Sequence, residues 1–220
     1  MQGLGEGSGR RLIHMRSGRA GASPALPGAL LACCLGTLVF LWGCSPPSQP
    51  FNATEVSGID YGRGLKIADT AGQLRSLEDF DDRVTIVFFG FTMCPDVCPN
   101  TLLRLKQVRN SLGEAAERVQ VIVVSVDPER DTPERLAAYV NNFDASFIGL
   151  RPEPQQLEAV IKAFYAIAVK VPSKDGSSYT VDHSATLYVY DRSNRLRLIT
   201  QPDFRLDAFA DDLRRLVAEG

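Results

Sequence analysis

Residues 84–99 read VTIVFFGFTMCPDVCP and contain a buried strand followed by a pair of cysteines. The first eight residues form a continuous β-branched and aromatic run, which is typical of a strand buried on both faces of a sheet. From Pro99 onward the apolar residues recur at helical spacing, which predicts an amphipathic helix over 99–112. A second apolar run, VQVIVVSV at 119–126, completes a strand–helix–strand unit with an expected right-handed crossover.

The remaining apolar patterns place further elements on both sides of this unit. They predict, in chain order, a small hairpin at 65–67 and 73–74, a helix over 133–143, a strand at 147–150, a helix over 157–164, a hairpin of strands 185–191 and 195–200, and a closing helix over 206–216. The order strand–helix–strand, helix, hairpin, helix is that of a thioredoxin-like fold. We therefore predict an α/β, thioredoxin-like fold with an N-terminal hairpin and an inserted helix–strand segment.

Residues 1–44 are predicted to be a targeting segment. Their apolar core is about 15 residues long, which is short for a membrane-spanning helix and typical of a signal peptide. Arg16 and Arg19 supply the positive flank, and the run ends in LWGC, whose last residue is Cys44. This ending resembles a bacterial lipobox and makes Cys44 a candidate lipidation site. An uncleaved signal anchor is the alternative, and both interpretations place a membrane-tethered domain outside the cytoplasm.

The sequence after the targeting segment divides into a tether and a domain. Residues 45–57 are rich in Pro and Ser and predict a flexible tether. Residues 58–220 remain for one folded domain, which is long enough to bury a core. The net charge of the chain is −2 and no basic face is evident, so we expect no binding to nucleic acid.

Position in the sequence separates the five cysteines into two groups. Cys33, Cys34 and Cys44 fall in the targeting segment, so the predicted domain contains only Cys94 and Cys98. These two lie after a buried strand, at the edge of the sheet where open α/β folds place their sites. The start of the following helix favours a thiolate at Cys98. A disulfide at this spacing would close only a small loop, so a purely structural role explains the pair poorly.

His183 is the only histidine of the predicted domain, because His14 lies upstream of the apolar core. The loop that enters strand 185–191 lies beside the cysteine loop in a thioredoxin-like fold, so His183 should face the cysteines. Two thiolates and an imidazole are soft ligands that suit copper, zinc or iron–sulfur clusters. Structural zinc normally takes four protein ligands, and a cluster needs more thiolates. Cys94, Cys98 and His183 therefore predict one copper ion per chain, as three-coordinate Cu(I) or as Cu(II) with an added oxygen ligand.

Two aspartates are candidates for a supporting role at this site. Asp182 directly precedes His183 and could orient its ring. Its alternative role is a hydrogen bond to the local backbone. Asp127 ends the second buried strand and should lie near the same edge of the sheet. For Asp127 we favour a role in the turn that starts the next helix over a role at the metal.

Three stretches together resemble the Sco/SenC family: FFGFTMCPDVCPNTL, VSVDPERDTPERL and VDHSATLYVYD. Their order and spacing match the family across roughly residues 58–218, and Cys94, Cys98 and His183 match its metal ligands. The resemblance implies a thioredoxin-like copper protein tethered to the inner membrane of bacteria or mitochondria. It further implies that the protein delivers copper to the dinuclear copper centre of cytochrome c oxidase subunit II, or keeps the cysteines of that centre reduced. Other copper chaperones or thiol reductants are then expected partners.

The lipobox-like Cys44 favours the bacterial branch of the family, with the domain in the periplasm. We expect a metallochaperone rather than an enzyme, with a redox disulfide between Cys94 and Cys98 as its oxidised form. A thiol-disulfide oxidoreductase is one alternative, although such enzymes have two residues between their cysteines and a proline in the place of residues 180–184. A peroxiredoxin-type peroxidase fits less well, because the cysteine loop lacks a basic partner. A redox or copper sensor is the third alternative.

Overall fold

The computed structural model describes residues 49–220. The predicted targeting segment, including Cys44, lies outside the described residues. No helix within 49–220 has the length and apolar character needed to cross a membrane.

The central strand of the domain is β4 (Val84–Gly90), whose seven residues are all buried. It pairs in parallel with β5 (Val119–Ser125) along its whole length, because the connecting helix α1 (Val97–Ser111) returns the chain to the same end of the sheet. On its other side β4 pairs antiparallel with β9 (Leu187–Tyr190). The strand–helix–strand unit that the sequence predicted is confirmed.

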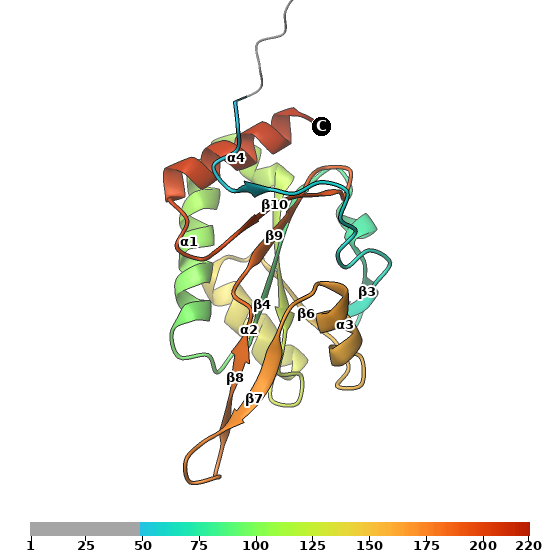
Figure 1. The fold of residues 1–220 in the computed structure, drawn as a ribbon, viewed down its shortest axis with the longest axis vertical. Helices are drawn as coiled ribbons and strands as arrows, with labels where there is room; N and C mark the ends of the chain where they lie inside the picture. Colours follow the sequence, from blue (N-terminus) through green and yellow to red (C-terminus); the bar gives the residue numbers. More distant parts are fainter. Residues whose placement is uncertain (1–48) are drawn as a thin grey trace, which may run out of the picture. The chain divides into compact units, whose positions relative to one another are not determined.

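Eight strands form the main sheet (Figure 1). Their spatial order is β1 (Thr54–Glu55), β10 (Leu196–Thr200), β9, β4, β5, β6 (Ile148–Arg151), β2 (Ile67–Asp69) and β3 (Leu74–Arg75). The predicted N-terminal hairpin is β2–β3, and it joins the sheet because β2 pairs antiparallel with β6. The inserted helix–strand segment is also confirmed: α2 (Pro133–Phe143) leads into β6, which pairs in parallel with β5.

Helices cover both faces of this sheet. One face carries α1, which packs against α4 (Leu206–Ala218) and α2. The opposite face receives Phe164, at the end of α3 (Leu157–Ala163), whose ring meets the ring of Phe89 edge-on at 5.0 Å between centroids. Successive side chains of β4 point to opposite faces of the sheet, and helices cover both faces, so the strand is buried on both sides. Two short 3₁₀ helices, η1 (Leu77–Phe80) and η2 (Gly113–Arg118), complete the domain.

A second, two-stranded sheet was not predicted from the sequence. It consists of β7 (Ala168–Pro172) and β8 (Tyr179–His183), which pair antiparallel and project beyond the main sheet, away from α4 (Figure 1). Val169 and Val171 alternate along β7 but are exposed, so this hairpin does not have the buried apolar face by which strands are usually found. The segment that the sequence analysis treated as a loop before strand 185–191 is therefore a strand that ends at His183.

Part of the predicted flexible tether is ordered. Thr54 and Glu55 form β1 on the edge of the sheet, and Asp212 of α4 accepts hydrogen bonds from the backbone N–H groups of Asn52 and Ala53 at 2.8–3.0 Å. Asp212 is buried, and these hydrogen bonds replace those that its carboxylate would make to water in the unfolded chain. The folded unit therefore begins before residue 58, because the carboxylate of Asp212 accepts a hydrogen bond from the N–H group of Asn52, 160 positions earlier in the sequence.

Candidate metal centre

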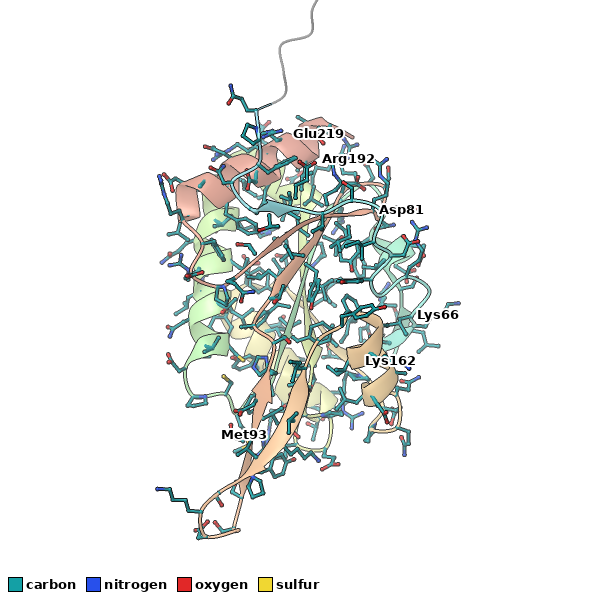
Figure 2. All side chains as sticks on the ribbon, in the orientation of Figure 1. Lys66, Asp81, Met93, Lys162, Arg192 and Glu219 are labelled. Carbon is teal, nitrogen blue, oxygen red and sulfur yellow. The ribbon has the colours of Figure 1, made fainter. Side chains whose placement is uncertain are left out.

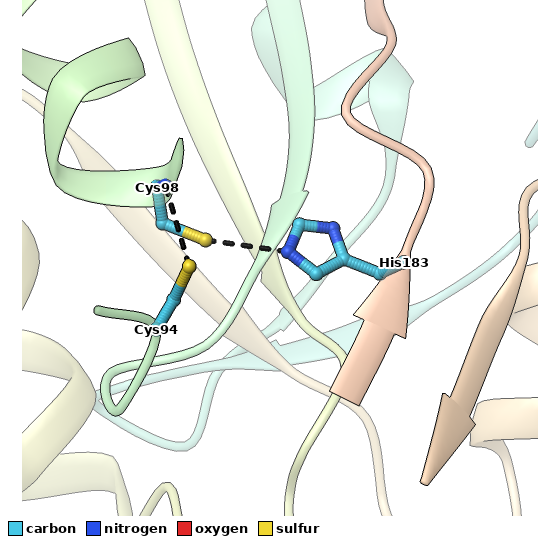
Figure 3. A group of neighbouring side chains, drawn as sticks. All are labelled: Cys94, Cys98 and His183. Carbon is cyan, nitrogen blue, oxygen red and sulfur yellow. Dashed lines mark hydrogen bonds between the residues drawn. The ribbon is translucent and has the colours of Figure 1, made fainter. Parts of the chain in front are cut away.

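The cysteine loop connects β4 to α1 and turns tightly over its first residues. The backbone N–H of Cys94 donates to the carbonyl of Phe91 at 3.2 Å. Cys98 lies in the first turn of α1, and its N–H donates to the Sγ atom of Cys94 at 3.4 Å. The helix start thus points a backbone donor at one sulfur and brings the second sulfur beside it (Figure 3).

His183 reaches the cysteines from the end of β8. Its Nε2 atom is 3.3 Å from the Sγ atom of Cys98, and its Nδ1 atom is 3.0 Å from the carbonyl oxygen of Ser184. A carbonyl oxygen only accepts hydrogen bonds, so Nδ1 carries a proton, and Nε2 is the ring nitrogen that faces the sulfurs. The rings of Phe88 and Phe91 meet the imidazole edge-on, with centroids 6.2 and 5.7 Å away, and fix its plane.

The three side chains converge on one point. The Sγ atoms of Cys94 and Cys98 and a ring nitrogen of His183 all lie within 4.8 Å of one another. Within residues 49–220 they are the one group of three potential ligands that could hold a metal ion. Two sulfurs and one imidazole form a soft donor set, and its three donors match the number that Cu(I) accepts.

The two sulfurs have different electrostatic environments. Hydrogen bonding from Cys98, together with His183 and the backbone N–H groups at the helix start, lowers the pKa of Cys94 to about 3. The shared hydrogen bond with Cys94 and burial raise the pKa of Cys98, and the charge of Asp131 adds to this effect. The sequence analysis placed the thiolate at Cys98; the structure places it at Cys94, because Cys98 is buried and donates its own N–H to Cys94.

Cys94 is also the more accessible of the two sulfurs. It lines an open hollow of about 300 Å³ together with Asp96, Val97, Asp182 and other residues of the cysteine loop and β8. Met93 beside it is 53% exposed and lies toward the end of the domain opposite Glu219 (Figure 2). A partner can therefore approach the thiolate without rearrangement of the core.

The orienting role considered for Asp182 is filled by another group. Asp182 is exposed and precedes His183 on β8, where it pairs with Val169 in the hairpin. The hydrogen bond of Nδ1 goes to the backbone carbonyl of Ser184. The tautomer of the ring is thus set by the backbone and not by this carboxylate.

Asp127 acts on the strand that bears the histidine. It is fully buried, forms an ion pair with Arg130 and accepts a hydrogen bond from the hydroxyl of Tyr179 at 2.8 Å. Arg130 also donates to the backbone carbonyl of Tyr179 at 2.8 Å and lies over its ring, 3.7 Å from the centroid. Tyr179 begins β8 and His183 ends it, so Asp127 supports the ligand by fixing this strand and does not itself reach the sulfurs.

Sequence reasoning missed two residues that shape the site, Asp131 and Gly90. Asp131 stands just before α2, but Thr132 caps that helix by accepting the N–H of Arg135. Asp131 is fully buried and instead accepts from Thr92, 39 positions away. No local pattern identifies such a contact, because it depends on two loops meeting at the edge of the sheet.

Gly90 leaves the space that Cys98 occupies. A Cβ atom at this position would lie 3.2 Å from the Sγ atom of Cys98 and 3.1 Å from the ring of Phe88. We predict that Gly90→Ala displaces the sulfur by a few tenths of an ångström and weakens Cu(I) binding about tenfold. Losses of metal affinity of about this size are typical when a residue that contacts the metal ligands is replaced. Competition titration against a chromophoric Cu(I) chelator measures this change.

Gly149→Ala is the matched control for Gly90→Ala. Its Cβ would lie 2.7 Å from the Cγ atom of Leu136, a fully buried residue outside the ligand set. This variant should lower the free energy of unfolding and leave the Cu(I) affinity unchanged. Equal losses of affinity in both variants would show that general destabilisation, and not crowding of Cys98, is the cause.

The fold and its three convergent ligand atoms define a thioredoxin-like domain with a sulfur-rich, three-ligand metal site. The SCO1/SenC family matches residues 55–218, and the chain belongs to this family.

Relatives cover most of the chain. An SCO2-like protein of Rickettsia prowazekii is 30% identical over 187 residues, which are 83% of this chain and 89% of that protein. The structure of Bradyrhizobium japonicum ScoI with copper bound is 36% identical, covers 71% of this chain and 99% of that one, and has a TM-score of 0.65. The solution structure of apo Sco1 from Thermus thermophilus is 38% identical, covers 77% and 99%, and has a TM-score of 0.68.

Proposed function

We propose that this protein is a copper chaperone that binds one copper ion through the Sγ atoms of Cys94 and Cys98 and the Nε2 atom of His183. The observation that carries the proposal is the convergence of these three soft ligand atoms within 4.8 Å. The copper-bound ScoI structure, which is 36% identical to this chain, supports the choice of metal. Cu(I) is the form for which three ligands suffice.

The destination that we propose for the copper is the dinuclear copper centre of cytochrome c oxidase subunit II. The Sco family is one of cytochrome c oxidase assembly proteins, and the chain belongs to it. The geometry suits delivery, because Cys94 lines an open hollow while Cys98 is buried. An acceptor thiolate can enter beside Cys94 and replace the ligands one at a time, so the ion is never released to water.

The test is direct transfer between purified proteins. The full chain, with Cys33, Cys34 and Cys44 replaced by serine, is loaded with copper and mixed with the reduced copper-binding domain of subunit II in the presence of a competing chelator. After two equivalents of Cu(I) have been transferred and one electron has been removed with ferricyanide, the absorption and EPR signals of the dinuclear centre should appear in the acceptor. Complete capture of the copper by the chelator, with no signal in the acceptor, would contradict delivery.

A thiol reductase acting on the same centre is the second candidate. It is favoured by the low pKa of Cys94, about 3, which keeps this sulfur an accessible thiolate at neutral pH. The copper-free, reduced chain is mixed with the oxidised acceptor domain, and free thiols are counted by mass spectrometry after alkylation. Reduction of the acceptor without transfer of copper would favour this function over delivery.

We further propose that the chain is held at a bacterial cell membrane with its domain in the periplasm. The lipobox-like ending at Cys44 supports a lipid anchor, and the apolar run before it equally suits a signal anchor. The relatives in Rickettsia and Bradyrhizobium support a bacterial setting. An anchored chaperone would meet a membrane-bound oxidase on the same surface.

A further inference from the structure

Strand β8 has one edge that is paired with β7 and one edge that is open. The N–H of Ser173 donates to the carbonyl of Ser178 at 2.9 Å at one end of this antiparallel ladder. The N–H of Ser184 donates to the carbonyl of Ile167 at 2.9 Å at the other end, in the same register. Hydrogen-bonded and non-hydrogen-bonded pairs alternate along such a ladder, so the backbone groups of Val181 point away from β7.

The open edge of β8 carries backbone groups without partners. Tyr179, Val181 and His183 are the outward-pointing residues of this strand by the same alternation. The carbonyl of Tyr179 accepts a hydrogen bond from Arg130 at 2.8 Å, but no hydrogen bond within residues 49–220 reaches the backbone groups of Val181 and His183. An unpaired strand edge is a template for the addition of another strand. β8 therefore offers donors and acceptors to one further extended segment.

This open edge borders the hollow that Cys94 lines. The hollow has a volume of about 300 Å³ and is lined by residues 180–183 of β8 and residues 94–97 of the cysteine loop. Figure 3 shows the cysteines on one side of β8 and β7 on the other. A strand added at the open edge would lie about 4.8 Å from β8. Its side chains would then reach the Sγ atom of Cys94, which is itself within 4.8 Å of the ring nitrogen of His183.

The lining of the hollow indicates which side chains the added segment should carry. A cysteine suits the position beside Cys94, because a soft sulfur ligand can take the place of another at copper. Asp96 and Asp182 are exposed and line the hollow from the cysteine loop and from β8, and no lysine or arginine lines it. This arrangement favours a basic residue in the segment. Val97, which is 42% exposed, offers an apolar contact.

We propose that the open edge of β8 docks an extended, cysteine-bearing segment of the copper acceptor. The segment adds as a strand beside Val181, brings its thiol to Cys94 and places a lysine or arginine near Asp96 and Asp182. The proposal rests on the proposed function in taking the partner to be the protein that receives copper. The docking itself needs only the unpaired backbone groups of β8.

The first test removes one backbone donor from the open edge. Val181→Pro deletes the N–H that points at the hollow and leaves the pairing with β7 intact, because proline is tolerated where the N–H faces away from the neighbouring strand. The full chain, with Cys33, Cys34 and Cys44 replaced by serine, is loaded with Cu(I) and mixed with the reduced copper-binding domain of subunit II. Transfer should be about tenfold slower than from wild type, because a hydrogen bond is lost and the proline ring takes its place. Equal rates would overturn the proposal.

Two control variants separate the open edge from the stability of the hairpin. Val181→Ala removes the same buried side chain but keeps the N–H. Lys170→Pro places a proline directly across the ladder from Val181, where the lost N–H points away from β8. Both variants should transfer copper within about twofold of the wild-type rate, because the open edge of β8 is unchanged. A loss in Val181→Ala equal to that in Val181→Pro would show that loosening is the cause and would overturn the proposal.

Amide hydrogen exchange tests the edge in a chain with no substitution in β8. The probe is the synthetic peptide acetyl-Lys-Val-Cys-Val-Lys-amide, added to the reduced, copper-free chain. Exchange of the Val181 N–H should slow by at least about tenfold, and that of Lys170, on the far edge of the hairpin, should not change. The same peptide with proline in place of both valines should give no protection, because it lacks the N–H donors. An unprotected Val181 at the highest peptide concentration would overturn the proposal.

The outcomes distinguish failure of this docking mode from failure of the proposed function. If wild type passes no copper to the subunit II domain but the peptide protects Val181, delivery to that acceptor fails and the docking edge stands. If copper passes equally from wild type and Val181→Pro, delivery stands and the docking edge fails. Sedimentation velocity of the chain alone tests the remaining occupant. A dimer that Val181→Pro abolishes would assign the edge to a second copy of the chain and overturn the proposal.

Discussion

Replacement of both Cys94 and Cys98 by serine is expected to abolish stoichiometric Cu(I) binding. The site has three potential ligand atoms, two of which are these sulfurs. Serine keeps the size of the side chain but replaces a soft thiolate with a neutral hydroxyl, which Cu(I) binds poorly. We expect the affinity to fall by at least about a thousandfold, equivalent to about 4 kcal/mol. Competition against a chromophoric Cu(I) chelator, with reductant present, measures this loss.

Two further variants make this result specific to the ligand set. His183→Ala should weaken binding less than the double serine variant, because both thiolates remain. Met93→Leu is the control, since Met93 is an exposed sulfur-containing residue of the same loop and the proposed ligand set does not include it. It should bind Cu(I) like wild type. A double serine variant that still bound one Cu(I) per chain would contradict the assigned site.

The elements that the sequence predicted well are those whose burial is evident from a short, continuous stretch of residues. Each of β4 and β5 is a run of seven buried residues, and each appears in the sequence as a mostly apolar run that contains only Thr85 in β4 and Gln120 and Ser125 in β5 as polar residues. The loop between β4 and α1 is then fixed by topology, and with it the position of Cys94 and Cys98. The convergence of His183 on this loop also followed from the expected fold, since it needed only the order of the strands.

The features that sequence reasoning missed depend on contacts between distant segments. The hairpin β7–β8 has exposed valines, so it lacks an apolar pattern, and it is held by the contacts of Tyr179 with Arg130 and Asp127. Which of the two cysteines is the thiolate also could not be predicted from the sequence. It depends on how deeply Cys98 is buried and on the charge of Asp131, neither of which is encoded by the cysteine spacing itself.

Loss of this protein from the cell is expected to lower the copper content and activity of cytochrome c oxidase while leaving its transcripts unchanged. The expectation follows from the site: an accessible thiolate at Cys94 beside a buried Cys98 suits passing an ion on more than storing it. Copper added to the medium should restore part of the activity, because a high supply of metal bypasses a delivery step. Oxidase activity and the spectrum of its dinuclear copper centre, measured with and without added copper, test this.

Complementation then connects the cellular effect to the site. The wild-type chain and Met93→Leu should restore oxidase in copper-poor medium, whereas the Cys94→Ser/Cys98→Ser chain should not, although all three have the same sequence outside these positions. Normal oxidase in the deletion strain under copper limitation would contradict the chaperone function and favour a sensor. Restoration by a reductant instead of copper would indicate that the cysteine pair serves the oxidase as a source of electrons. Copper delivery and thiol reduction would both use the sulfurs of Cys94 and Cys98. Rescue by copper would therefore identify the copper-bound pair as the working form in the cell, and rescue by reductant would identify the copper-free dithiol.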